Sequence, residues 1–358
     1  MKIVLLPGDG IGPEVTEQAR LCLELLSDRG GLGFAFEEHA MGGAAIDRFG
    51  VPLPQDTIAA CVEADAILLG AVGGPAWDGA KLRPEAGLLE LRAVLGVYAN
   101  LRPARVIEGL EHLSPLRPEI AGGADVLVVR ELTGGSYFGE KKLGDAVASD
   151  LCTYSRVEIE RVAHIAFRAA QARSGRVTSV DKANVLATSK LWRRTVEDVA
   201  RGYPEVALDH MYVDSAAMAL VMNPRRFDVL LTENMFGDIL SDEMSVIAGS
   251  IGLLASASLG DGGPGLFEPI HGSAPDIAGQ DRANPCGAIA SAAMLLEDGL
   301  GLRSQAALLR AAIDEALRGP VLTADLGGDA GCAAMGAEIR RLLAARLDAR
   351  SDPQGKAA

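Results

Sequence analysis

The sequence predicts an α/β protein with two domains, and three observations support this fold class. Short apolar runs, typical of buried strands, alternate along the chain with stretches of helical periodicity. The 358 residues exceed the roughly 150 residues of an average domain. Hydrophobic residues make up 49% of the chain and charged residues 23%, which is ordinary for a soluble globular protein.

Six apolar runs are predicted to be buried strands. Each is short, continuous and rich in β-branched residues or leucine, which suits a sheet that is covered on both faces. The runs are residues 2–6, 66–72, 125–130, 176–180, 207–213 and 227–231.

Helices are predicted between these strands. Pro13 suits the first turn of a helix, and Ser155 with Glu158 has the spacing of a capping box at the start of another. Further helices are expected at residues 286–298, 304–318 and 335–347. The last eight residues, SDPQGKAA, are expected to be a frayed tail.

The composition excludes several classes of function. A formal net charge of −14 disfavours nucleic acid and anionic membranes as partners. No segment approaches the roughly 18 apolar residues of a membrane span, and the N-terminal apolar run is too short for a signal peptide. The five cysteines are odd in number and lack metal-ligand spacing, so we predict free thiols in the reducing cytoplasm.

A glycine-rich turn after the first strand imitates a dinucleotide-binding fingerprint. Gly8, Gly10 and Gly12 have the spacing G-x-G-x-G instead of G-x-G-x-x-G. Asp9 would also repel a pyrophosphate at the N-terminus of the following helix. We therefore predict a tight turn near a site and not a Rossmann-type site.

Charged side chains near predicted strand ends are candidates for a site, because ligands gather there in α/β proteins. Arg92, Arg102 and Arg130 offer paired N–H donors that suit carboxylates. Asp238 and Asp242 stand four apart on a probable helix, where they repel each other by a few tenths of a kcal/mol. A divalent cation would compensate this repulsion, although from the spacing alone a solvated acidic face is the more ordinary explanation.

Three further features are weaker signals when each is taken alone. Lys182 follows a predicted strand, where a lysine beside a metal and arginines can accept a proton. Tyr137 lies in a glycine-rich stretch that brings the backbone close to a ligand. The segment GLFEPIHGSAPDIAGQDRANP is predicted to be a loop, whose small residues and amides can hold a nucleotide, with Asp276 accepting a hydrogen bond from a ribose hydroxyl.

Taken together, these stretches resemble the β-decarboxylating dehydrogenases, the family of isopropylmalate and isocitrate dehydrogenases. The family motifs occur in order as LLPGDGIGPEV, GAVGGPAWD, LRAVLGVYANLRPA, ELTGGSYFGEK, VDKANVLATSKLWR, DVLLTENMFGDILSDE and HGSAPDIAG. Two departures are Ser136, where a larger apolar residue is common, and the variable stretch after Gly139.

The resemblance implies an isopropylmalate dehydrogenase-like fold with two α/β domains and a shared large mixed sheet, not a Rossmann fold. Residues 1–98 and 250–358 would form a discontinuous cofactor-binding domain. Residues 99–249 would form a dimerisation and substrate/metal domain, with a variable arm near 133–155. The family is homodimeric, and each active site takes residues from both subunits.

The resemblance also implies an NAD-dependent and divalent-metal-dependent oxidative decarboxylation of a 2-hydroxy acid. Lys182 would accept the hydroxyl proton and Tyr137 would protonate the enol, with Lys182 and Asp214 supplied by the partner subunit. The substrate would lie against Arg92, Arg102, Arg130, Asp214, Leu88 and Glu85, and Mg²⁺ or Mn²⁺ against Asp214, Asp238 and Asp242. NAD would lie against Gly74, Glu85, His271, Gly272, Ser273, Ala274, Asp276, Ile277 and Asn284.

Substrate choice within the family depends on the segment around Glu85 and Leu88. Isocitrate-specific members carry hydroxyl or amide donors there, whereas RPEAGLLELR is apolar and acidic and would repel a third carboxylate. The expected reaction is the conversion of 3-isopropylmalate to 4-methyl-2-oxopentanoate, CO2 and NADH, in leucine biosynthesis. Isocitrate, homoisocitrate and D-malate remain alternative substrates. A non-catalytic regulatory subunit is a remote alternative, because such a subunit should lack part of the catalytic set.

Overall fold

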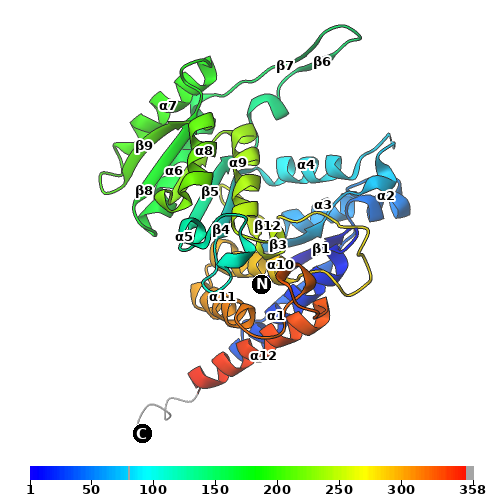
Figure 1. The fold of residues 1–358 in the computed structure, drawn as a ribbon. Coiled ribbons are helices and arrows are strands. Elements are labelled where there is room, and N and C mark those ends of the chain that lie inside the picture. The colour runs from blue at the N-terminus through cyan, green and yellow to red at the C-terminus, as the bar shows by residue number, and fades with distance from the viewer. Residues whose placement is uncertain (80, 352–358) are drawn as a thin grey trace. The chain divides into compact units, whose positions relative to one another are not determined.

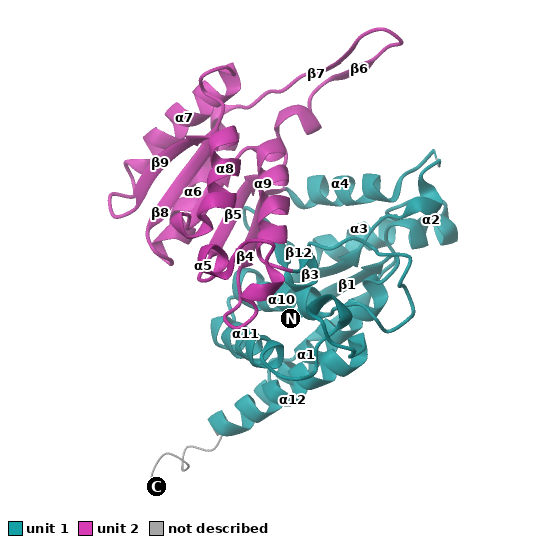
Figure 2. Cartoon of the chain, in the orientation of Figure 1, with its two compact units in different colours: residues 1–96, 250–358 teal, residues 97–249 magenta. Residues whose placement is uncertain are grey.

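The computed structural model describes residues 1–79 and 81–351, so residues 352–358 of the predicted tail lie outside the described residues. The chain divides into two compact units (Figure 2). Unit 1 comprises Met1–Gly96 and Ser250–Ala358, and unit 2 comprises Val97–Gly249. The chain passes from one unit to the other after Gly96 and returns after Gly249.

Unit 1 is built on five strands in the order β2-β1-β3-β12-β11. The pairs β1–β2, β1–β3 and β3–β12 are parallel, and β11–β12 is antiparallel. Buried side chains from three of these strands, such as Leu6, Leu69 and Leu266, pack into one apolar core. The bounds are Lys2–Gly8 for β1, Ala35–Glu38 for β2, Ala66–Ala71 for β3, Ala255–Gly260 for β11 and Gly265–Pro269 for β12.

Seven α-helices accompany these strands among the described residues, and α1 packs against α10 and α12 (Figure 1). Pro13 lies in the first turn of α1, as predicted, and Gly31 ends that helix in a left-handed conformation, with φ 64°. The bounds are Gly12–Gly30 for α1, Gly43–Phe49 for α2, Gln55–Val62 for α3, Pro84–Leu95 for α4, Cys286–Met294 for α10, Arg303–Leu317 for α11 and Cys332–Ser351 for α12.

Unit 2 contains five strands in the order β4-β5-β10-β8-β9 and a two-stranded hairpin, β6–β7, in the predicted arm. The pair β4–β5 is antiparallel, and the other pairs of the five are parallel. The bounds are Val97–Arg105 for β4, Asp125–Glu131 for β5, Lys141–Leu143 for β6, Ala148–Asp150 for β7, Arg176–Asp181 for β8, Ala207–Tyr212 for β9 and Val229–Thr232 for β10. Ten of the twelve strands in the described part of the chain belong to the large mixed sheet, which confirms the predicted α/β class.

The helices of unit 2 are α5 (Pro118–Ala121), α6 (Arg156–Gln171), α7 (Ala187–Ala200), α8 (Val213–Met222) and α9 (Asn234–Ile247). The predicted capping box begins α6. The Ser155 hydroxyl accepts a hydrogen bond from the Glu158 N–H at 3.3 Å, and the Glu158 carboxylate accepts one from the Ser155 N–H at 2.6 Å. Both orphan N–H groups of the helix terminus are thereby satisfied.

Two sequence predictions are wrong. Residues 265–269 are not a loop but strand β12, in which Leu266 and Phe267 are fully buried. Pairing with β3 and β11 on its two sides outweighs the loop preference of Gly265 and Pro269. The run at 207–213 does form a strand, but it is not a buried one, because β9 is an edge strand and pairs with β8 alone in the described part of the chain.

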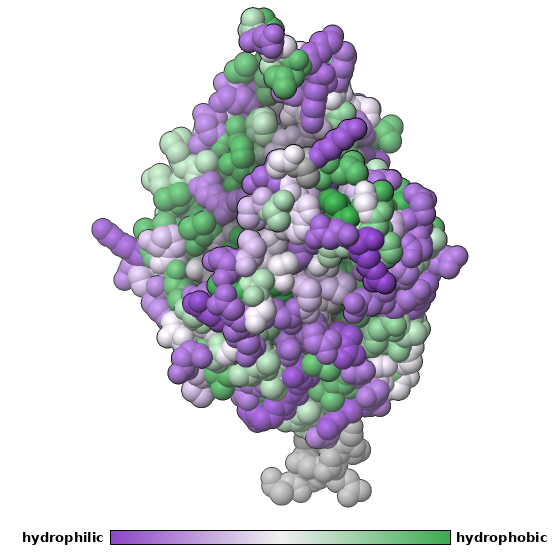
Figure 3. Space-filling view, turned by 90° about the vertical axis from the view of Figure 1, so that its right-hand side faces the viewer, coloured by the Kyte–Doolittle hydropathy of each residue, from purple (hydrophilic) through white to green (hydrophobic). Residues whose placement is uncertain are grey.

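The surface shows no membrane-spanning helix among the described residues, and the cysteines form no disulfide. The face in Figure 3 is a mosaic of hydrophilic and hydrophobic residues, and no helix within residues 1–79 and 81–351 has the length and hydrophobicity to cross a membrane. The five cysteines are free thiols, as predicted, and four of them are buried.

Asp9 organises the glycine turn that follows β1. Its buried carboxylate accepts hydrogen bonds from the N–H groups of Gly43, Ala44 and Gly73 at 2.7–2.8 Å. A Cβ on Gly8, whose φ is 72°, would lie 2.0 Å from the Ala71 carbonyl oxygen, so only glycine fits there. The turn is therefore tight, as predicted, and its carboxylate is engaged by the protein's own backbone.

Replacing Asp9 by alanine is expected to lower the free energy of unfolding by about 3 kcal/mol or more, because three N–H groups, two of them in buried hydrogen bonds, lose a charged acceptor. Urea denaturation measures this loss. Asp47→Ala is the matched control, since Asp47 is exposed and accepts a single 3.2 Å bond from Trp77; its cost should stay below about 1 kcal/mol. Equal costs for the two variants would contradict the role given to Asp9.

Candidate active site

Four predicted site residues of unit 2 meet at helix α9. Arg130 ends β5 and forms an ion pair with Asp238, while Arg102 on β4 pairs with Asp242 at an N–O distance of 3.0 Å. Because Asp238 and Asp242 are one helical turn apart, both carboxylates lie on the same side of α9. Their mutual repulsion is compensated in the structure by one arginine for each carboxylate.

Asn234, the first residue of α9, was not among the predicted site residues, yet it holds Arg130. Its Oδ1 atom accepts hydrogen bonds from Arg130 Nε at 3.0 Å and Nη2 at 2.7 Å. Its Nδ2 donates to the carbonyls of Leu132 and Gly134, both at 3.1 Å. One buried amide therefore fixes the guanidinium and the backbone of the segment that leads to Tyr137. Its position two residues after the buried strand β10 was the only available signal.

Tyr137 joins the cluster at the end of a short 3-10 turn, Gly135–Tyr137. Its hydroxyl donates a hydrogen bond to Asp238 Oδ2 at 3.0 Å, and its ring is 41% exposed. Partial burial, followed by this hydrogen bond to a carboxylate, raises the pKa of the Tyr137 phenol. The phenol therefore remains protonated at neutral pH and can serve as a proton donor.

Lys182 and Asp214 form a second group in unit 2. Lys182 follows β8 and Asp214 lies in the first turn of α8, and Nζ lies 2.5 Å from Oδ1. The hydrogen bond from Lys182 lowers the pKa of the Asp214 carboxyl. A metal site within one chain would need at least three His, Cys, Asp or Glu ligand atoms close together. Among the described residues, Glu14, Asp281 and Cys332 are the only such group within 4.8 Å of one another. Asp214 therefore does not join Asp238 and Asp242 within one chain.

A buried glutamate supports the same helix. Glu233 caps α9 by accepting a hydrogen bond from the Phe236 N–H at 2.7 Å. It also accepts one from the Tyr154 hydroxyl at 3.0 Å, and this hydroxyl in turn accepts from the Asn234 N–H. Burial is the largest effect on Glu233 and raises the pKa of its carboxyl.

This shift predicts a pH dependence of stability. A carboxyl with a raised folded-state pKa binds its proton more tightly when folded, so stability is lost as pH rises from the unfolded value, about 4.3, through the raised pKa. As pH rises through this range, the free energy of unfolding of the parent should fall relative to that of Glu233→Gln. Urea denaturation at a series of pH values measures this difference. The exposed Glu119→Gln variant should show no such trend, and a pH-independent difference for Glu233→Gln would contradict the assignment.

Unit 1 carries the predicted specificity residues on α4. Glu85, Leu88 and Arg92 are three and seven residues apart and therefore share one side of the helix. Leu88 packs partly against the core, and the exposed Glu85 places Oε1 beside Gly73. Arg92 Nη2 lies 2.6 Å from Glu268 Oε1, in a largely buried ion pair.

The predicted cofactor loop of unit 1 lies on the glycine turn. The Ser273 carbonyl accepts a hydrogen bond from the Ile11 N–H at 2.8 Å. His271 is buried, its Nδ1 lies 2.9 Å from the Gly272 carbonyl, and its Nε2 has no partner among the described residues. Burial lowers the pKa of His271, so the ring is neutral and offers Nε2 as an acceptor.

The remaining cofactor-loop residues differ in how much they leave free for a ligand. Asp276 is exposed, as is Gly272, whereas Ile277 is half-buried. Ala274 has a positive φ of 37°. Asn284 is engaged internally, because it accepts from the Cys286 N–H at 3.0 Å and donates to Asp325 at 2.9 Å. Its side chain therefore supports the loop, and His271 and Asp276 offer the freer polar groups.

Comparison with known proteins gives the family. The profile described as isocitrate/isopropylmalate dehydrogenase matches residues 2–339. The chain belongs to this family. The match spans both units, including every predicted site residue, and it confirms the resemblance expected from the motifs.

Relatives within the isocitrate/isopropylmalate dehydrogenase family are similar over nearly their whole length. A 3-isopropylmalate dehydrogenase of Anaeromyxobacter dehalogenans is 55% identical over 96% of this chain and 99% of its own. A chloroplastic 3-isopropylmalate dehydrogenase of Arabidopsis thaliana is 52% identical over 97% of this chain and 89% of its own. The solved isocitrate dehydrogenase of Methylococcus capsulatus is 35% identical, with a TM-score of 0.86 over 96% of this chain and 99% of that one.

Proposed function

We propose that the chain catalyses the NAD-dependent oxidative decarboxylation of 3-isopropylmalate to 4-methyl-2-oxopentanoate and CO2, in cytoplasmic leucine biosynthesis. The observation that carries this proposal is the cluster of Arg102, Arg130, Tyr137, Asp238 and Asp242 at α9. It combines carboxylate-binding arginines with a protonated phenol and hard oxygen ligands. The choice of substrate is supported by relatives named 3-isopropylmalate dehydrogenase that are more than 50% identical to this chain.

Each group has one role in the proposed reaction. Arg102 and Arg130, with Arg92, bind the carboxylates of the substrate. Lys182 accepts the proton of the C2 hydroxyl. NAD, which the loop with His271 and Asp276 would help to hold, would supply the hydride acceptor when bound. After loss of CO2, Tyr137 donates a proton to C3 of the enol. The phenol that donates this proton is the one hydrogen-bonded to Asp238 in the free chain.

The carboxylates of Asp214, Asp238 and Asp242 fit a hard divalent cation, because Mg²⁺ and Mn²⁺ prefer oxygen ligands. A bound cation would supply Lewis-acid stabilisation of the negative charge that develops on loss of CO2. Asp238 and Asp242 now neutralise arginines, and they would exchange these partners for the cation when the arginines bind the substrate.

We also propose that the active protein is a homodimer whose sites combine residues of two subunits. Asp214 lies in the first turn of helix α8. The same helix exposes three apolar side chains at helical spacing, Met218, Val221 and Met222. The neighbouring α9 exposes Ile239 and Val246. Exposed apolar side chains on two neighbouring helices are typical of an interface. A monomer in native mass spectrometry at micromolar concentration would contradict this proposal.

One assay tests the reaction and its alternatives. NADH formation from 3-isopropylmalate, isocitrate and D-malate is compared with Mg²⁺ and with EDTA, and NAD is compared with NADP. We expect 3-isopropylmalate to react fastest, EDTA to stop turnover, and NAD to be preferred because Asp276 would repel a 2′-phosphate. Faster turnover of isocitrate would favour an isocitrate dehydrogenase. No turnover of any of the three substrates would favour a non-catalytic subunit.

Leu88 is predicted to contribute to substrate choice. Leu88→Thr should cost about 1–3 kcal/mol in kcat/KM for 3-isopropylmalate relative to D-malate, the usual worth of a few methylenes in a pocket. The matched control is Leu89→Thr, because Leu89 is 47% exposed and lies one residue along α4. An equal change for both substrates would show that Leu88 does not contact the isopropyl group.

A further inference from the structure

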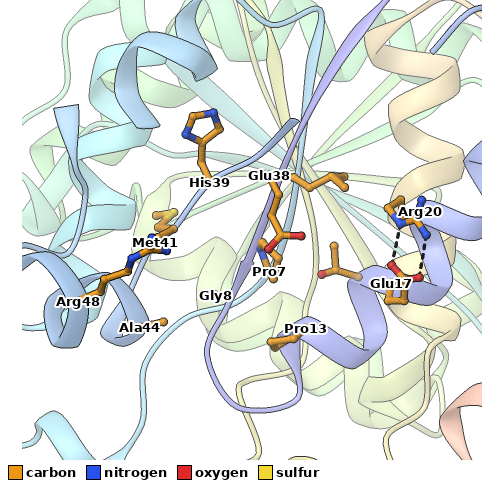
Figure 4. A pocket seen from close by; sticks show the side chains of 13 residues that line it. Pro7, Gly8, Pro13, Glu17, Arg20, Glu38, His39, Met41, Ala44 and Arg48 are labelled. Carbon is orange, nitrogen blue, oxygen red and sulfur yellow. Dashed lines mark hydrogen bonds and ion pairs between the residues drawn. The ribbon is translucent and has the colours of Figure 1, made fainter. Parts of the chain in front are cut away.

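Unit 1 contains a hollow of about 290 Å³, whose lining includes none of the residues given a role in the proposed reaction. It lies where β1, the first turns of α1, the segment after β2 and helix α2 meet (Figure 4). Its volume is near the roughly 300 Å³ at the lower end of small-molecule pockets. The question is which ligand its lining suits.

The hollow exists because two strands separate. β1 and β2 pair in register as far as Leu5 and Glu38, and the His39 N–H then bonds to the Leu5 carbonyl at 3.0 Å. Pro7 has no N–H with which to continue the pairing. The apolar part of the lining includes the buried Leu5 and Met41 together with the prolines that flank the glycine turn.

The charges of the lining are of two kinds. Arg20 and Glu17 neutralise each other in an ion pair of 2.7 Å, drawn in Figure 4, and His39 lies 2.9 Å from Glu37. Glu38 and Arg48 have no ion pair within the part of the chain that the structure describes, and the Arg48 guanidinium only lies over the Phe49 ring, 4.8 Å from its centroid. One negative and one positive side chain of the lining, both exposed to solvent, thus have no ion-pair partner among the described residues, and they come from different elements.

We propose that this hollow binds a small zwitterion with an apolar body, of the chemical class of an α-amino acid with an aliphatic side chain. Its ammonium group pairs with Glu38, its carboxylate with Arg48, and its side chain lies on the more accessible apolar lining, Pro7 and Pro13. An anion or a cation alone would satisfy one of the two charged groups and partly desolvate the other without a partner, which is unfavourable.

The test is calorimetric titration of the full-length protein with L-norvaline, beside pentanoate and pentylamine, which carry one charge each on a similar apolar chain. We expect saturable binding of one L-norvaline per chain at millimolar concentrations and at least about tenfold weaker binding of the other two, since one charge-assisted hydrogen bond is worth that much. Arg48→Gln and Glu38→Gln should each weaken L-norvaline binding at least about tenfold.

Three further variants separate the pocket from general effects. Ala44→Leu, which fills the hollow from α2 without changing a charge, should abolish binding. Arg201→Gln and Glu63→Gln, exposed residues outside the lining, should leave it unchanged. The proposal fails if L-norvaline does not saturate, if pentanoate or pentylamine binds as tightly, or if the Arg48, Glu38 and Ala44 variants bind like the parent. Because binding is measured without turnover, this result is independent of the proposed reaction.

Discussion

Lys182→Met is expected to lower kcat about a thousandfold or more, because it removes the base that accepts the C2 hydroxyl proton. Methionine keeps the length of the side chain but breaks the 2.5 Å ion pair with Asp214. Tyr137→Phe should instead slow the protonation that follows loss of CO2, so hydride transfer should survive in a single turnover. Stopped-flow measurement of NADH distinguishes these steps, and complete loss of hydride transfer in Tyr137→Phe would contradict the division of roles.

The substitutions Lys182→Met and Tyr137→Phe also test whether each active site combines residues of two subunits. If Tyr137 works with the partner subunit's Lys182, a heterodimer of one Lys182→Met chain and one Tyr137→Phe chain contains one intact site and one doubly impaired site. Its activity should return to about half of the wild-type value, provided that the two sites act independently. Co-expression with two different tags and purification on both provides this heterodimer. No gain over either parent homodimer would show that each site is built from a single chain.

Asp238→Asn is expected to lower kcat about a hundredfold or more, since it removes a charge that is proposed to hold the cation and position Tyr137. The amide keeps the shape of the side chain but loses the ion pair with Arg130 and weakens the acceptor of the Tyr137 hydroxyl. NAD affinity, measured by fluorescence titration, should be retained, because the proposed cofactor residues belong to unit 1 and Asp238 to unit 2. Asp209→Asn, on the exposed edge strand β9, is the control.

Two results would contradict this account of Asp238. A variant with full activity would show that the carboxylate is not a ligand of the cation. A loss of NAD affinity as large as the loss of kcat would show that the substitution acts through the fold. Thermal unfolding of the same preparations separates the second result from simple destabilisation.

Sequence patterns predicted the interior of the fold better than its margins. The run at residues 66–72 is continuously apolar because β3 is buried along its whole length, and such a strand is recognisable without its neighbours. β12 is different, because its short segment contains Gly265 and Pro269 and becomes a strand only through pairing with β3 and β11. Strand β2 is short and largely exposed, so it lacks an apolar run.

The candidate site shows the same limit. Arg102, Arg130, Asp238 and Asp242 were recognisable from motifs, but their pairing depends on how α9 lies across β4 and β5. Asn234 was missed because a single amide carries no charge or periodicity that marks it. Its importance becomes visible only when its four hydrogen bonds to Arg130 and the backbone are seen together.

The discontinuity of unit 1 has a consequence for synthesis on the ribosome. Unit 2 is one continuous segment, whereas β3 must wait for residues 265–269 before the edge opposite β1 is paired. During that interval almost two hundred residues are translated, and at elongation rates of about 5–20 residues per second the delay is about 10–40 seconds. During that interval the nascent chain therefore carries an apolar strand edge with unpaired N–H and C=O groups, and such an edge can pair with another chain.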